Sequence, residues 1–137
     1  MTMTAAEMSQ LMSNFDGGSP DRFSHDRQPR FVFTEGVMAV VEKARASWLL
    51  DLLAFDFAPF IKKSFLKNGT TMVQVKLSVA ANQRSARVFI LVAGTTQVLR
   101  TETFGVTTFP PGDWYFYIYP FEEDNAFCCE MILLNEY

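Results

Sequence analysis

The sequence predicts an α+β fold: an antiparallel five-stranded meander sheet with one long helix, plus short helices, packed on one face. Apolar residues recur at helical spacing in the first half of the chain and at every second residue after Gly69. Helices come first and short-looped strands follow, a sequence order typical of segregated layers rather than of alternating βαβ units. The 137 residues, 49% of them apolar, are enough for one hydrophobic core.

The first 30 residues are predicted to form a short helix and loops. Thr4 and Glu7 have the spacing of a capping box, which would begin a helix that ends near Asn14. Loop-forming residues follow at 17–20, where two glycines precede a serine and a proline. We therefore expect an N-terminal segment at 1–30 and a single α+β domain at 31–137.

The main helix is expected over residues 35–57, with Thr34 as its N-cap. Its apolar positions follow the helical spacing and comprise Val37, Val40, Val41, Ala44, Trp48, Leu52 and Phe55. Pro59 is expected to end the helix, because a proline pushes the preceding residue out of the helical region. A further short helix is expected from Phe60 to Lys67.

The five strands are predicted from alternation of apolar and polar residues. Short turns, among them Gly94-Thr95 and the segment 120–125, are expected to join neighbouring strands into hairpins. The expected strands are residues 73–79, 87–93, 97–104, 114–119 and 127–134.

The net charge and the first residues of the sequence indicate which partners and which cellular compartment to expect. A net charge of -3 and a pI of about 5.1 disfavour a protein that mainly neutralises phosphates. The start of the chain lacks the basic and apolar regions of a secretory signal. The apolar stretch Trp48–Ile61 is interrupted by charges and a proline and is too short for a membrane span. We expect a cytoplasmic protein that does not enter a membrane.

The charges are distributed unevenly along the chain. Residues 57–101 contain seven basic side chains and no acidic one, whereas residues 102–137 contain seven acidic side chains and no basic one. In the simpler interpretation, the basic and acidic strand faces pair across the sheet. Alternatively, a basic patch formed by Lys62, Lys63 and Lys67 lies apart from the acidic turn at 122–124, where it attracts a charged partner or drives head-to-tail self-association.

Few residues could support catalysis or bind a metal. His25 is the only histidine, and it and the two cysteines cannot supply four zinc ligands, so we expect neither a metal nor a cofactor. Cys128 or Cys129 could pair with His25 as a nucleophile with its base, but neighbouring cysteines in an apolar strand are more simply core thiols. Asp51 lies among leucines and is either a general base or the polar position of a buried helix. No catalytic residue is assigned, and the protein is expected not to be an enzyme.

The segment 114–119 is the most unusual feature of the sequence. Alternation places Trp114, Phe116 and Ile118 on one face, and it places Tyr115, Tyr117 and Tyr119 on the other. A row of tyrosines on an open sheet face can form a protein-binding surface or stack on nucleic-acid bases. It can also be ordinary cross-strand packing. We predict that this open tyrosine face is either a binding site for a partner protein or the contact of a homodimer.

The order of motifs resembles an uncharacterised family, a domain of unknown function found in bacteria, phages and other mobile elements. The most specific piece is Thr34-Glu35-Gly36-Val37 leading to Trp48-Leu49-Leu50-Asp51. The other pieces are the region of Phe15, Phe23 and His25, the strand 75–79, Thr108-Phe109-Pro110 and the closing segment 133–137. The resemblance implies a small accessory protein of a mobile element in the cytoplasm of a bacterial host.

The expected function is that of a small non-enzymatic interaction protein. It would bind and inhibit a host protein complex, for example a defence system. The alternative is a nucleic-acid-binding module that uses the basic 62–100 segment and the tyrosine face. The candidate interaction residues are Tyr115, Tyr117, Tyr119, Lys62, Lys63 and Lys67.

Overall fold

The computed structural model describes residues 3–15, 21–82, 85–104 and 108–136. The loop expected at 17–20 lies outside this range. The α+β class is confirmed, since helices and one mostly antiparallel sheet make up the described chain. The elements are α1 (Ala5–Ser13), β1 (Arg22–His25), β2 (Gln28–Thr34), α2 (Glu35–Ala44), α3 (Ser47–Asp51), the π-helix η1 (Leu52–Asp56), α4 (Ala58–Lys67), β3 (Val73–Val79), β4 (Ala86–Val92), β5 (Val98–Phe104), β6 (Gly112–Glu123), β7 (Ala126–Leu133) and the 3-10 helix η2 (Leu134–Glu136).

The sheet is not the expected five-stranded meander. Its seven described strands follow the order β1-β2-β7-β6-β3-β4-β5, so the chain passes from β5 back across the sheet to place β6 beside β3. β6 fits this central place because Trp114, Phe116 and Ile118 are buried on one of its faces. The side chains of β5 are mostly exposed, which suits a strand at the edge of the sheet.

Two of the strands lie in the N-terminal part of the chain, where loops and a short helix were expected. β1 pairs with β2 as a hairpin, and β2 then pairs with β7 in parallel, with Phe31 opposite Cys129. Residues 1–30 therefore also contribute β1 and the beginning of β2 to the sheet. The alternation in β2 is short, and nothing in its sequence indicates a partner strand 98 residues further along the chain.

The single long helix expected at 35–57 is divided into separate pieces. Thr34 caps α2 as expected, its hydroxyl accepting a hydrogen bond from the Val37 N–H at 3.2 Å. Arg45 then adopts a left-handed conformation with φ of 53°, which ends α2 and turns the chain. Beyond it, α3 and η1 bury Leu49, Leu50 and 52–54, so this part of the chain is surrounded by protein on more than one side.

The other helix boundaries agree with the sequence. Thr4 and Glu7 form the predicted capping box at the start of α1. Pro59 lies in the first turn of α4, where the N–H that proline lacks would have no partner within the helix. α4 ends at Lys67, as expected. No helix among the described residues is long and apolar enough to cross a membrane.

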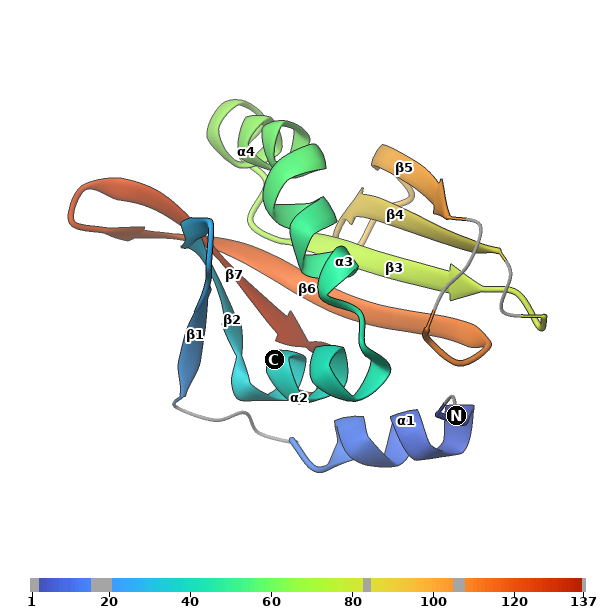
Figure 1. The fold of residues 1–137 in the computed structure, drawn as a ribbon. Coiled ribbons are helices and arrows are strands. Elements are labelled where there is room, and N and C mark those ends of the chain that lie inside the picture. Colours follow the sequence, from blue (N-terminus) through green and yellow to red (C-terminus); the bar gives the residue numbers. More distant parts are fainter. Residues whose placement is uncertain (1–2, 16–20, 83–84, 105–107, 137) are drawn as a thin grey trace.

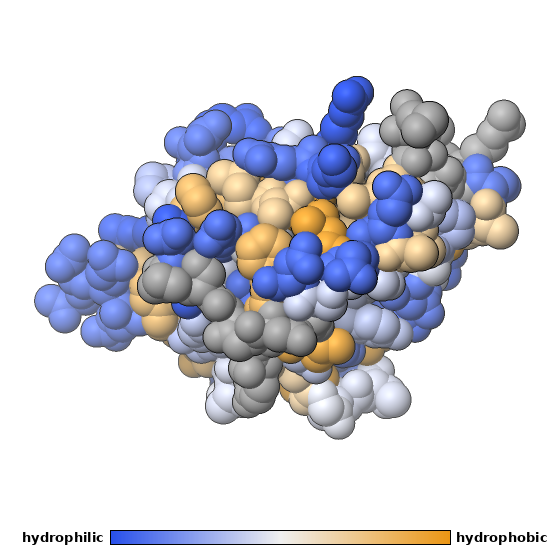
Figure 2. Space-filling model, turned by 90° about the horizontal axis from the view of Figure 1, so that it is seen from below, coloured by the Kyte–Doolittle hydropathy of each residue, from blue (hydrophilic) through white to orange (hydrophobic). Residues whose placement is uncertain are grey.

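The helices cover one face of the sheet. Figure 1 shows α3 and α4 running across this face, while α2 packs near β2 and β7 and α1 lies outside α2. The core lies between the layers, where the side chains of β3, β4 and β6 meet Phe57, Ile61 and the leucines of α3 and η1. The hairpin of β6 and β7 extends beyond the helices. Its tip, Glu122–Asn125, is exposed and forms the hydrophilic projection on the left of Figure 2.

Candidate functional site

The tyrosine face is the sheet face opposite the helices. Tyr115, Tyr117 and Tyr119 are half-buried there and alternate with the buried apolar residues of β6. Tyr115 lies opposite Lys76 of β3, and Tyr117 lies between Gln74 of β3 and Ile132 of β7. The rings are therefore held by cross-strand neighbours while part of each ring remains exposed.

The tyrosine face continues onto β4. Phe89 lies opposite Lys76 in the strand register and is half-buried. The Lys76 ammonium and the Arg87 guanidinium each lie 5.9 Å from the centre of its ring. Lys76 also approaches the carboxylate of Asp113, at 4.0 Å. The face thus combines aromatic rings with a few charged groups, a composition common in protein interfaces.

The three candidate lysines do not join this face. Lys62, Lys63 and Lys67 lie exposed on α4, which packs against the core through Ile61, Ser64 and Phe65. α4 belongs to the helical layer on the other side of the sheet (Figure 1). The six residues proposed from sequence therefore form two separate surfaces.

The simpler interpretation of the uneven charges holds only in part. Lys76 and Asp113 pair across β3 and β6, as cross-strand neutralisation requires. On α4, by contrast, Lys62 lines the same pocket as Asp124 of the acidic tip. The basic helix and the acidic tip therefore flank one hollow.

His25 and Asp51 are joined by the fold. The buried His25 ring places Nε2 at 2.7 Å from the Asp51 carboxylate, and its Nδ1 accepts the backbone N–H of Arg27 at 3.1 Å. Because Nδ1 accepts a hydrogen bond, Nε2 carries the proton that is donated to Asp51. The Arg27 guanidinium lies 3.5 Å from the same carboxylate and 5.0 Å from the ring centre of Phe55. These contacts fasten the β1–β2 turn to the helical layer.

Both nitrogens of His25 are thus engaged, which leaves neither free to activate a nucleophile in this geometry. The histidine lines a cleft of about 530 Å³ with Asp51, Glu42 and Arg45, and the cysteines are not among its lining residues. The sequence suggested His25 and Asp51 separately. The two residues are 26 positions apart in the sequence, and only the structure shows that they are in contact.

The two cysteines are free thiols on strand β7. Cys128 donates a weak hydrogen bond to the carbonyl of Ala126 at 3.6 Å. Burial raises the pKa of Cys129 to about 12, which keeps it a neutral thiol at neutral pH. A thiol that stays protonated is a poor nucleophile.

A group of carboxylates near the C-terminal end of the described chain was not anticipated from sequence. Burial raises the pKa of Glu130 above its usual range, although its salt bridge with Arg22 acts in the opposite direction. Glu136 accepts hydrogen bonds from the Thr34 hydroxyl at 2.5 Å and from the Leu133 N–H at 2.9 Å. These contacts tie the last turn of the chain to the start of α2. Among the described residues, no three side chains of His, Cys, Asp or Glu gather to hold a metal ion.

Fold and site together define an α+β protein with one mixed sheet, a helical layer on one face and an aromatic opposite face. A family model described as a family of unknown function (DUF6876) matches residues 6–137, and the chain belongs to that family. This confirms the resemblance of the motifs to a domain of unknown function. No curated protein and no solved structure matches the chain.

Proposed function

We propose that this protein acts by binding another protein through the tyrosine face and does not catalyse a reaction. One observation carries the proposal: a sheet face that no helix of the described chain covers presents three tyrosines on β6 and Phe89 on β4, with β3 between these two strands. Tyrosine offers a large apolar ring with a polar tip, and it is enriched in protein interfaces and among their energetic hot spots.

The side chains of the tyrosine face are also preorganised for binding. Its rings are packed against cross-strand neighbours, so a partner would order few mobile side chains on contact. Within the described part of the chain, the hydroxyls of Tyr115 and Tyr119 have no hydrogen-bond partner, and both remain available to a bound protein.

The proposal extends to the kind of partner. The small size, the acidic balance and the motif resemblance favour an accessory protein of a phage or mobile element. It would bind and inhibit a host protein complex, for example a defence system. A second copy of the chain is the other occupant of the same face, giving a homodimer.

The experiment compares two double variants with the unaltered protein. Tyr115→Ser with Tyr119→Ser alters the tyrosine face, and Lys63→Ser with Lys67→Ser alters the helical layer as a matched control. Light scattering measures self-association, and a pull-down from host lysate measures capture of a partner. We expect a dimer or a captured partner that is lost in the tyrosine variant and kept in the lysine variant.

Two outcomes contradict the proposal. In the first, the tyrosine variant, shown by circular dichroism to be folded, keeps the mass and the partners of the unaltered protein. In the second, the unaltered protein is monomeric and captures nothing above background.

Nucleic-acid binding is the second candidate, and one observation favours it. Lys76 and Arg87 flank Phe89 on the same face as the tyrosines, so cations lie beside rings on which bases could stack. It ranks second because Asp113 pairs with Lys76 and the chain carries a net charge of -3. A titration with single- and double-stranded oligonucleotides at low and moderate salt tests it. Salt-sensitive binding supports this candidate, and its absence rejects it.

A further inference from the structure

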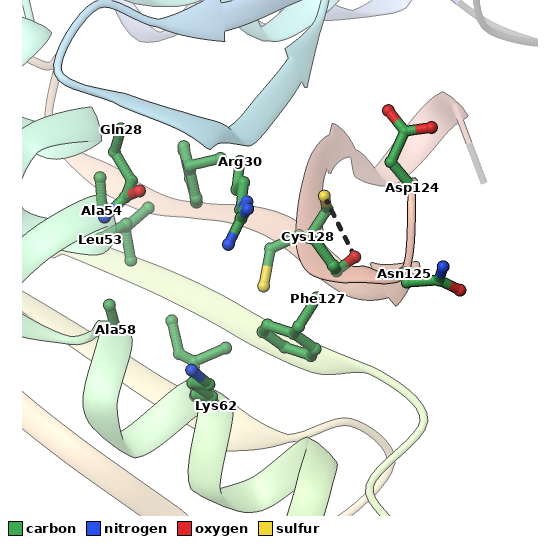
Figure 3. Close-up of a pocket in the computed structure, with 14 residues that line it drawn as sticks. Gln28, Arg30, Leu53, Ala54, Ala58, Lys62, Asp124, Asn125, Phe127 and Cys128 are labelled. Atoms are coloured by element: carbon green, nitrogen blue, oxygen red, sulfur yellow. Dashed lines mark hydrogen bonds between the residues drawn. The ribbon is translucent and has the colours of Figure 1, made fainter. Parts of the chain in front are cut away.

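A pocket of about 490 Å³ opens between β2, the helical layer and the β6–β7 hairpin. Its volume lies in the range of small-molecule sites. Figure 3 shows that its walls come from strand β2 on one side, α4 and η1 on another, and the turn of the β6–β7 hairpin with the start of β7 on the third. The pocket is separate from the tyrosine face and from the His25 cleft, and its role does not depend on the proposed function.

The floor of the pocket is apolar. Phe31, Leu53 and Ile61 are buried core residues that reach its surface, and the ring of Phe127 borders it from the hairpin. The Cys129 thiol also faces this space and adds no charge, because it stays protonated at neutral pH. A hydrophobic group could therefore enter without displacing buried charges.

Two cations reach into this apolar space from opposite walls. Arg30 extends from β2 and Lys62 from α4, and both side chains line the hollow. Arg30 has no ion pair among the described residues, and the Lys62 ammonium lies 5.9 Å from the centre of the Phe127 ring and interacts electrostatically with Cys129. Asp124 and Asn125 lie on the hairpin tip and point away from the cavity (Figure 3).

The charges around the pocket are the reverse of those of the chain as a whole. Arg30 and Lys62 supply two positive charges and Asp124 one negative charge, which leaves the lining at +1 in a protein of net charge -3. A guanidinium without a protein partner can bind both oxygens of a carboxylate through paired hydrogen bonds. The Gln28 amide adds one more polar group at the same wall.

We infer that this pocket binds a small carboxylic acid with an apolar body. The carboxylate lies between Arg30 and Lys62, and the apolar body rests on Phe31, Leu53, Ile61 and Phe127. The charge pair selects for the anion, and the floor selects for a hydrophobic group. A sugar has neither the negative charge nor the apolar body, and a free inorganic anion lacks the apolar body, so neither ligand matches both features of the pocket.

The test uses 1-naphthoate as the probe and 1-naphthalenemethanol as its uncharged counterpart, both titrated into the full chain by calorimetry. Arg30→Gln with Lys62→Gln removes both cations. Lys63→Gln removes a neighbouring charge from α4 that does not line the pocket and is the matched control. We expect the double variant to bind naphthoate more weakly by roughly tenfold or more, as loss of charge-assisted hydrogen bonds implies. The control and the affinity for the alcohol should be unchanged.

Three results would overturn the inference: naphthoate fails to bind the unaltered protein, the alcohol binds as tightly as the acid, or the double variant binds naphthoate undiminished. Arg30 and Lys62 are exposed, so their replacement should leave the fold intact, and a thermal melt checks this. If the double variant does not fold, Ala58→Phe provides the second test. It fills the pocket from α4 and should abolish binding of the acid, and undiminished binding to this variant contradicts the inference equally.

Discussion

At the scale of single residues, the contact between His25 and Asp51 does most to join the two layers at the β1–β2 turn. His25 is buried and donates from Nε2, whereas Asp51 is partly exposed and accepts from both His25 and the Arg27 guanidinium. A buried donor left without a partner is costly, so the carboxylate contributes more than a surface ion pair does.

Replacing Asp51 tests this role. Asp51→Ala leaves the His25 Nε2–H without its acceptor and should lower the free energy of unfolding by about 1–3 kcal/mol. Asp51→Asn keeps an acceptor oxygen at the same place and should cost clearly less. Urea denaturation of both variants, with Asp56→Ala at an exposed position as control, measures the difference. Equal losses for Ala and Asn would show that the hydrogen bond to His25 is not what matters.

At the scale of elements, the start of α2 packs so closely against Leu133 and Glu136 that a side chain at position 36 would force one of these neighbours to shift. A Cβ atom on Gly36 would lie 2.8 Å from Leu133 Cδ1 and 2.9 Å from Glu136 Cδ. Leu133 is buried, and the Glu136 carboxylate is held by Thr34 and by the Leu133 N–H. Neither neighbour can move without losing packing or hydrogen bonds.

Gly36→Ala should therefore destabilise the protein, although alanine is the better helix former by about 1 kcal/mol. We expect overpacking to outweigh propensity, with a net loss of about 1–2 kcal/mol in denaturant unfolding. A double-mutant cycle with Glu136→Ala identifies the cause, because removing the carboxylate relieves part of the clash. A stabilising effect of Gly36→Ala would mean that helix propensity dominates and that the contact relaxes easily.

At the scale of the whole molecule, the strand order decides which elements are most protected. β3 pairs with both β4 and β6, and every second side chain along it is buried. β5 pairs with β4 on one side and is the last strand in the sheet order. In the meander expected from sequence, β3 would be the edge strand and β5 an interior one.

Amide hydrogen exchange distinguishes these two arrangements. The β3 amides, residues 73–79, should exchange among the slowest in the protein, with opening free energies close to that of global unfolding. The outward-facing amides of β5 should exchange rapidly, because they have no strand to bind. Slow exchange throughout β5 together with rapid exchange in alternate β3 residues would favour the meander and contradict the strand order described here.

The sequence by itself determined the local structure. Thr4 and Thr34 predicted helix starts because capping depends on a residue and its neighbours within four positions. The positions of β3, β4, β5 and β7 and the two faces of β6 followed from alternation, which needs no knowledge of strand partners. The length of β6 did not, because the strand continues to Glu123 through most of the segment expected to be a turn. The tyrosine face was visible for the same reason.

Only the tertiary structure decided which elements meet. It placed β6 beside β3, joined β2 to β7 in parallel, and bent the expected long helix at Arg45. It also brought together His25 with Asp51, and Arg30 with Lys62, and it separated the lysines of α4 from the tyrosines. These contacts depend on which apolar faces pack together in the one shared core. A local sequence pattern does not indicate which distant residues will meet there.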